Sequence, residues 1–279
     1  MPSITADEWL EAAAHRRSVH GLAGTSKVSD ERVQQLVSKV LSFAPSSYNT
    51  QPVRISLAFG EKHKELWSII LEEVEPVLKS INPAIWEKLG PFLQNHKAAY
   101  GSILFWERGQ TTKEAAETHK ATSHMFSEWG DHAQGIHQIL VWTALELEGV
   151  GANLQHMNAI PPVEAAIKRF AGVPEDYKLK AHLNYGDEQA DHPEKPKKLP
   201  IAETLTAHCR DTDDSLINTS QAPAVSSILD RQDCFLVGAL SPLGRKHLAS
   251  MGGFGARKCW KSRSGYGALD YEKSRHSRC

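Results

Sequence analysis

The sequence predicts an α+β fold in which helices dominate. Apolar residues spaced three and four apart predict several amphipathic helices, whereas short runs of alternating polar and apolar residues predict strands. Because the strands do not alternate regularly with the helices, we expect an α+β sandwich rather than a doubly wound parallel sheet. The 279 residues are enough to bury a substantial core. We expect a main domain over residues 1–205 and a distinct extension over 206–279.

The first helix is expected over residues 5–18. Thr5 can cap its N-terminus, and Arg16 and Arg17 would fall at its last turn, where cations interact favourably with the helix dipole. A second helix should start after Ser29, which can cap it in the same way. Its expected buried stripe consists of Val33, Leu36, Val37, Val40 and Leu41.

The same helical and strand spacings of apolar residues predict the remaining elements. Strands are expected over residues 53–59, 101–107 and 177–185. Further helices are expected over residues 61–80, 132–148 and 161–170. The strand at 53–59 should have one covered face. The helix at 132–148 is apolar around most of its circumference, so it should lie at the centre of the molecule.

Composition and charge argue against several classes of protein. The net charge is -1, so the chain as a whole does not indicate a nucleic-acid partner. Its first residues are acidic and polar, unlike a secretory signal peptide. No run approaches the roughly 18 apolar residues of a membrane span. We therefore expect a soluble protein of the cytoplasm, or of the cytoplasm and nucleus, that does not bind membranes.

Residues 206–279 differ in composition from the rest of the chain. They hold 11 Lys and Arg against 7 Asp and Glu, or +4, whereas residues 1–205 hold 21 against 26, or -5. All four cysteines lie here, and no two are close enough for a CxxC pair. No amphipathic period persists, so we expect disorder. A basic tail could bind nucleic acid, but a solvated extension is the favoured interpretation.

The histidine spacing does not indicate a metal site. Three pairs are five residues apart: His15 and His20, His119 and His124, and His132 and His137. On a helix this spacing separates side chains by about 140°, whereas a helical metal pair needs a spacing of four. We expect ordinary surface or hydrogen-bonded histidines and no bound metal.

Three polar segments could hold a ligand. The loop at 44–52 (APSSYNTQP) carries many hydrogen-bonding side chains, although Pro, Ser and Asn are also common in simple turns. The run Arg16-Arg17-Ser18 offers a guanidinium that can bind a phosphate through paired hydrogen bonds and a hydroxyl that can add another. Alternatively, the arginines could form a cationic cap at the end of the helix, which would not explain the serine. Residues 149–156 (GVGANLQH) would let backbone amides approach a flat ring, or form a C-cap glycine followed by a strand.

Together these segments resemble the FMN-dependent nitroreductase family. RRS resembles its RxS phosphate motif, and PSSYNTQP resembles its PSSxNxQP loop. GVGANLQHMN and the order of elements resemble the fungal fatty-acid-repression-mutant-type subgroup, which is implicated in lipid signalling. The resemblance covers roughly residues 5–205. It implies a dimeric sandwich with helices around a central, mostly antiparallel sheet.

The resemblance also implies which residues bind FMN. RRS would hold the phosphate and ribityl chain, the loop would reach the flavin across the dimer interface, and amides of 152–155 would contact the flavin N5 region. His20 would stand where relatives often carry a basic residue. The implied set is Arg16, Arg17, Ser18, His20, Pro45, Ser46, Ser47, Asn49, Gln51, Gly151, Ala152, Asn153, Leu154, Gln155 and, for a further phosphate contact, Lys197 or Lys198.

The implied activity is that of an NAD(P)H oxidoreductase. NADH or NADPH would donate a hydride, and a nitroaromatic or quinone-like small molecule would accept one at the same flavin face in a ping-pong cycle, with no catalytic side chain. The expected assembly is a homodimer, with a link to lipid signalling or oxidative stress. The alternative is an FMN-binding regulatory protein with little turnover. A basic-tailed nucleic-acid binder is disfavoured by the acidic main body.

Overall fold

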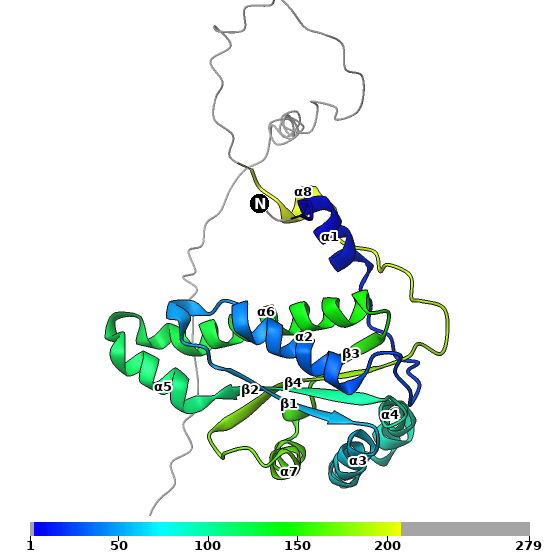
Figure 1. Cartoon of the computed structure of the whole chain (residues 1–279). Helices are drawn as coiled ribbons and strands as arrows, with labels where there is room; N and C mark the ends of the chain where they lie inside the picture. Colours follow the sequence, from blue (N-terminus) through cyan, green and yellow to red (C-terminus); the bar gives the residue numbers. More distant parts are fainter. Residues whose placement is uncertain (1–2, 208–279) are drawn as a thin grey trace, which may run out of the picture. The chain divides into compact units, whose positions relative to one another are not determined.

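A computed structural model describes residues 3–207 (Figure 1). Four strands form one open sheet in the order β1-β2-β4-β3, and each neighbouring pair is antiparallel. They are β1 (Val53–Phe59), β2 (Gly101–Arg108), β3 (Gly151–Gln155) and β4 (Tyr177–Gly186). Helices surround this sheet, so the predicted α+β class is confirmed.

Helices cover both faces of the sheet, with α2 and α6 on one side and α3, α4 and α7 on the other (Figure 1). They are α1 (Ala6–His15), α2 (Asp30–Phe43), α3 (Glu61–Ile81), α4 (Pro83–His96), α5 (Gly109–Thr118), α6 (Phe126–Leu147), α7 (Pro161–Ala171) and the short α8 (Ile201–Thr204). Three 3-10 turns are η1 (Ser47–Asn49), η2 (Lys120–Met125) and η3 (Met157–Ala159). None of these helices within 3–207 has an apolar stretch long enough to cross a membrane.

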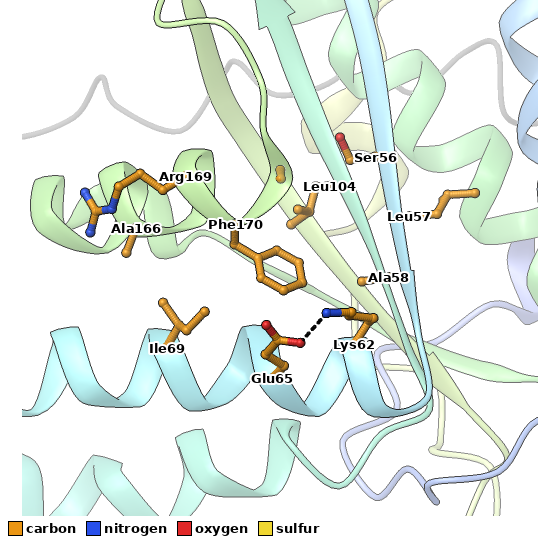
Figure 2. Close-up of a pocket in the computed structure, with 11 residues that line it drawn as sticks. Ser56, Leu57, Ala58, Lys62, Glu65, Ile69, Leu104, Ala166, Arg169 and Phe170 are labelled. Atoms are coloured by element: carbon orange, nitrogen blue, oxygen red, sulfur yellow. Dashed lines mark hydrogen bonds and ion pairs between the residues drawn. The ribbon is translucent and has the colours of Figure 1, made fainter.

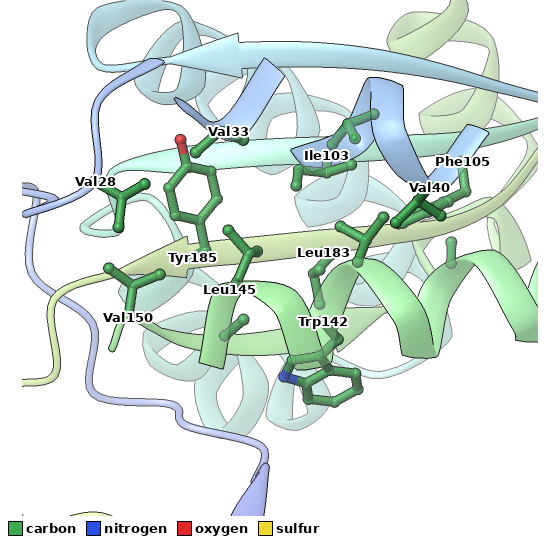
Figure 3. Close-up of a cluster of buried hydrophobic side chains, with 14 residues drawn as sticks. Val28, Val33, Val40, Ile103, Phe105, Trp142, Leu145, Val150, Leu183 and Tyr185 are labelled. Atoms are coloured by element: carbon green, nitrogen blue, oxygen red, sulfur yellow. The ribbon is translucent and has the colours of Figure 1, made fainter. Parts of the chain in front are cut away.

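Two hydrophobic clusters hold the layers together, one on each face of the sheet. Ile103 and Phe105 of β2 belong to the cluster under α2 and α6, which also contains Trp142 and is drawn in Figure 3. Leu104 and Trp106 belong to the cluster under α3 and α7. Successive side chains of a strand point to opposite faces, so the apolar run Ile103–Trp106 of β2 supplies both clusters.

The first strand has two covered faces, which corrects the expectation of one. Ile55 and Leu57 pack against the α2–α6 cluster, as the alternation predicted. Ala58 is buried in the opposite cluster, and the Oγ of Ser56 accepts a hydrogen bond of 3.0 Å from Nε1 of Trp106. The small and polar residues of the strand therefore face a second layer of helices rather than solvent.

Several helix boundaries also differ from expectation. Thr5 forms a capping box with Glu8, as its position predicted, but α1 ends at His15, so both arginines of RRS lie beyond the helix. Ser29 caps α2 as expected, whereas Leu41 of its predicted buried stripe is 40% exposed. Helix α6 begins at Phe126, six residues before the predicted start. The cysteines and the other features predicted for 208–279 lie outside the described residues.

Candidate functional site

The RRS segment lines a cavity of about 460 Å³ between the end of α1 and the chain that follows β4. One wall is formed by Ala13, Ala14, Arg16, Arg17 and Ser18, and the other by Pro193, Glu194, Lys195, Pro196 and Lys198. Four cations and a single carboxylate line the cavity, so it suits an anion. Of the two lysines that the sequence left open, Lys198 lines the cavity, and Lys197 is not among its lining residues.

The two arginines of RRS make different contacts. Nη1 of Arg17 donates to the carbonyl oxygens of Ala14, His15 and Arg16 at 2.6, 2.9 and 2.8 Å. Arg17 therefore caps the C-terminus of α1, as the cap interpretation of the sequence predicted. Arg16 instead lies with its guanidinium carbon 4.1 Å from the ring centre of Trp142.

Arg16 is the arginine that remains available to a ligand. The Nε atoms of both Arg16 and Arg17 are buried without a hydrogen-bond partner among the described residues, but Nη1 of Arg17 is already held by three carbonyl oxygens. An unpartnered buried N–H group costs free energy until a partner is supplied. Burial lowers the pKa of Arg16, and the carboxylate of Glu146 opposes that shift. An anion in the cavity would both supply an acceptor and compensate the buried charge.

Backbone pairing fixes the serine of RRS against the sheet. Ser18 bridges Ala152 in parallel, and the amide of Val19 donates to the carbonyl of Ala152 at 2.9 Å. Nδ2 of Asn153 donates to the carbonyl of Val19 at 2.8 Å. A Cβ at Gly151 would lie 2.8 Å from Cγ of Glu188 and 3.0 Å from Cβ of Val19, so a side chain here would force these neighbours to move. The sequence thus brings RRS and the start of β3 together.

Several residues of the segment 149–155 make contacts within the protein, in addition to the flavin contacts that the resemblance implies. Gly149 ends α6 with φ 81°, which confirms the C-cap glycine followed by a strand. Asn153 is buried, and its Oδ1 accepts hydrogen bonds from Gln155 at 2.9 Å and from Asn184 at 3.1 Å. Leu154 and Gln155 remain half-buried at the edge of the sheet. The side chain of Asn153 therefore holds protein groups together.

His20 does not line the RRS cavity. It is exposed, and its ring lies 5.3 Å from that of Phe92 and 6.3 Å from that of His96. Both partners belong to α4, a helix that the sequence did not predict. The structure therefore places His20 beside α4, apart from the cationic cavity.

The loop 45–52 has an unusual backbone. Tyr48, Asn49 and Gln51 have φ values of 53°, 52° and 51°, in the left-handed region that L-residues seldom adopt. Each such residue costs on the order of 1–3 kcal/mol, and they cluster at ligand sites. The Oγ of Ser46 accepts from the amide of Gln51 at 2.9 Å, so this serine serves the turn itself. Ser47 is half-buried, whereas Pro45 and the side chains of Asn49 and Gln51 are exposed.

Loop 45–52 and RRS are not brought together within one protomer. The ring of Tyr48 lies 5.8 Å from those of Phe126 and Trp129, at the start of α6. Arg16 packs on Trp142, thirteen residues further along the same helix. At 1.5 Å per residue, these two points on α6 are about 20 Å apart.

A cluster of titratable side chains adjoins the cavity, and the spacing of residues in the sequence did not predict it. Nδ1 of His15 lies 2.7 Å from Oε1 of Glu146, and Nε2 of His192 lies 3.4 Å from the same oxygen. These residues come from α1, α6 and the chain after β4, so no spacing within one helix could reveal them. They are a geometrically possible metal triad, but the hydrogen bonds of His192, described below, disfavour it.

A larger cavity, of about 710 Å³, contains none of the predicted site residues (Figure 2). It lies on the other face of the sheet, between β1, α3 and α7, with the side chain of Phe170 among its lining groups. Lys62 at its edge is paired with Glu65 at 2.6 Å. The larger cavity therefore offers no support for the predicted site, whereas the smaller cationic cavity contains Arg16, Arg17, Ser18 and Lys198 of the predicted set.

The family model described as "Nitroreductase family" matches residues 13–187, which is more than half of the chain. The chain belongs to the nitroreductase family. It is therefore an oxidoreductase of the nitroreductase type.

Known relatives of this nitroreductase come from yeast and bacteria. HBN1 of Saccharomyces cerevisiae is 28% identical over 191 residues, covering 67% of this chain and 91% of HBN1. The nitroreductase FRM2 of the same yeast is 31% identical over 152 residues, covering 54% of this chain and 74% of FRM2. These relatives confirm the resemblance to the fungal subgroup.

Solved structures agree with the fold. The nitroreductase CinD from Lactococcus lactis, in complex with chloramphenicol, has a TM-score of 0.64 and 28% identity, and the match covers 72% of this chain and all of CinD. A nitroreductase from Saccharomyces cerevisiae has a TM-score of 0.56 and 27% identity, covering 66% of this chain and 97% of that one. The expected nitroreductase-like sandwich is thus confirmed.

Proposed function

We propose that this protein is an FMN-dependent NAD(P)H oxidoreductase that reduces nitroaromatic or quinone-like acceptors. The observation that carries the proposal is the cationic cavity, where Arg16 and Ser18 face Lys195 and Lys198. A phosphate monoester carries about -1.5 to -2 charges and accepts several charge-assisted hydrogen bonds, so it fits this lining and supplies an acceptor for Arg16. FMN ends in such a group.

A homodimer would complete the site. Within a protomer, loop 45–52 and RRS contact points on α6 that are about 20 Å apart, whereas a second copy could bring its loop to the cavity. The layer that contains α2 and α6 exposes large apolar side chains suited to such an interface: Leu41, Phe43, Ile139 and Leu147 are 40%, 57%, 42% and 68% exposed. The outer face of α6 would lie at its centre.

The protein's part in the reaction is to bind and orient. When bound, FMN supplies the hydride-accepting and hydride-donating chemistry. Arg16, Ser18 and Lys198 would hold its phosphate, while Asn49 and Gln51 of the second protomer would offer amide groups to the flavin. Their loop holds three residues in the left-handed region without a ligand, and a backbone arranged in this way would reduce the entropy lost on binding.

The relatives support the choice of substrates. CinD structures contain chloramphenicol and 4-nitrophenol, which are both nitroaromatic compounds, and nicotinic acid, whose pyridine ring is like that of a nicotinamide. We extend these classes to this chain as acceptor and donor. Preference between NADH and NADPH is part of the test, and a role in lipid signalling or oxidative stress stays a prediction.

The test is FMN titration of the flavin-free protein, followed by NADH and NADPH oxidation with 4-nitrophenol as acceptor. Arg16→Ala should weaken FMN binding by about 10- to 150-fold, because it removes a charge-assisted phosphate contact. Arg169→Ala is the matched control, since this arginine is exposed on α7 at the larger cavity.

Two outcomes would contradict the proposal in different ways. A wild-type protein that does not bind FMN would refute flavin dependence. A protein that binds FMN but turns over neither NADH nor NADPH would instead support the regulatory alternative.

A further inference from the structure

One wall of the cationic cavity is a segment without regular secondary structure. Residues 187–200 connect β4 to α8 without forming a helix or strand, and Pro193–Lys198 supply the lysines of the cavity. From Asp191 to Pro200, His192 is half-buried and every other residue is exposed. Contacts of His192 therefore largely decide where this wall lies.

The hydrogen bonds of His192 define its protonation. Nε2 lies 3.0 Å from the carbonyl oxygen of His15, which can only accept, so Nε2 carries a proton. Nδ1 lies 3.0 and 3.2 Å from the carboxylate oxygens of Glu188, so it carries one too. Both nitrogens thus face acceptors, an arrangement that only the imidazolium satisfies fully, and an imidazolium has no lone pair for a metal ion.

The charges around His192 favour this state. Oε1 of Glu146 lies 3.4 Å from Nε2, and the ring of His15 stacks on that of His192 at 4.5 Å between centres, with 13° between the planes. The hydrogen bond to the His15 carbonyl chiefly raises the pKa of His192; partial burial opposes it, and Glu188 and Glu146 add to it. Arg16 also interacts with Glu146, so the cluster adjoins the phosphate-facing arginine.

We propose that the His192 imidazolium is a positioning residue that fastens Pro193–Lys198 to the end of α1, and so holds Lys195 and Lys198 across the cavity from Arg16. This inference rests on the proposed function, because it concerns the affinity of the cavity for the phosphate of FMN. That affinity would depend on the protonation of His192. When His192 loses that proton, one of its nitrogens faces an acceptor with a lone pair, and the attachment is broken. FMN affinity should then fall as pH rises through the titration of His192.

The experiment compares wild type with His192→Gln, titrating flavin-free protein with FMN and with riboflavin between pH 6 and pH 9. Wild type should bind FMN about tenfold more weakly at the alkaline end, and His192→Gln should be weak throughout and lack this alkaline loss. Riboflavin has no phosphate, so its affinity should change little in either protein. The phosphate of FMN itself titrates near pH 6, but identically for both proteins. His124→Gln, exposed in η2, is the matched control and should behave as wild type.

A second measurement uses wild type alone and does not depend on the folding of a variant. At pH 8 the phosphate of FMN is already deprotonated, so binding should take up protons through His192, which calorimetry in two buffers of different ionisation enthalpy detects. Proton release, or no exchange, would overturn the proposal.

The outcomes separate this inference from the proposed function. If wild type binds no FMN, the proposed function fails. If it binds FMN and His192→Gln shows the same affinity and pH profile, only the role of His192 fails. A one-to-one Zn²⁺ complex that His192→Gln abolishes would also overturn it, because a histidine ligand must be neutral.

Discussion

Acidification should destabilise this protein through three histidines buried between the sheet and α3. His63 places Nδ1 2.7 Å from the Oγ of Ser102 and Nε2 2.9 Å from the carbonyl oxygen of His96. His182 places Nε2 2.7 Å from the same Oγ. The rings of His96 and His182 lie 4.9 and 5.1 Å from that of Trp67. All three histidines are 0–1% exposed, so each should be neutral in the folded state.

The size of the effect follows from the pKa values. Burial chiefly lowers the pKa of His63 and of His96 to about 4, and lowers that of His182 well below 6.5. Between these values and 6.5 the unfolded chain binds more protons than the folded one, so the free energy of unfolding rises with pH and is lost as pH falls. At pH 5 the loss is about 2 kcal/mol for each of His63 and His96.

Urea denaturation between pH 4.5 and pH 7.5 measures this slope. His96 is the informative position, because neither of its ring nitrogens has a hydrogen-bond partner among the described residues. His96→Phe should therefore change the free energy of unfolding little at pH 7.5. It should reduce the number of protons taken up on unfolding, which the slope measures, by about one. His63→Leu should cost about 1–3 kcal/mol even at pH 7.5, because it leaves the Oγ of Ser102 and a carbonyl short of a partner.

A flat profile in wild type, or a His96→Phe slope equal to that of wild type, would show that these histidines are not buried neutral groups. His124→Gln, which changes an exposed histidine of η2, should leave the profile unchanged.

Two further predictions concern assembly and the extension. Ile139→Glu places a charge on the exposed apolar face of α6 and should give a monomer by light scattering that also loses FMN, whereas a monomer that keeps its flavin would contradict a shared site. Truncation after Thr206 should preserve FMN content, dimerisation and NAD(P)H oxidation within about twofold, a difference worth roughly 0.4 kcal/mol; loss of flavin or of the dimer would show that the extension wraps the partner.

Local sequence rules were sufficient where a feature depends on neighbours in the chain. The Thr5 and Ser29 caps, β1 and the C-cap at Gly149 were all predicted, because each depends on a few consecutive residues. Helix α4 was missed although Asn82 caps it and Pro83 stands in its first turn, which are local start signals; Pro91 inside it disfavours a helix locally, as Pro76 does inside the predicted α3. Tertiary packing against α3 overrides that preference.

The candidate site was predictable only in part. The motif at Arg16–Ser18 gave the cationic wall, but sequence could not separate the capping Arg17 from the available Arg16, because that depends on which carbonyl oxygens each side chain reaches. Choosing Lys198 over Lys197 requires the path of the chain after β4. The contact of His192 with Glu146 joins parts of the chain that no local period connects.

The strand order has a consequence for synthesis on the ribosome. β4 is the last strand to be made, yet it lies between β2 and β3, and within residues 3–207 β3 pairs with no other strand. A nascent chain that ends before Tyr177 can form the antiparallel β1–β2 pairing but leaves the other edge of β2 uncovered. At 5–20 residues per second, the 68 residues between Arg108 and Tyr177 take roughly 3–14 seconds to make. During that interval this edge of β2 is available to chaperones and to other unfinished chains, so translation speed through α6 and α7 should influence how much protein reaches the native state.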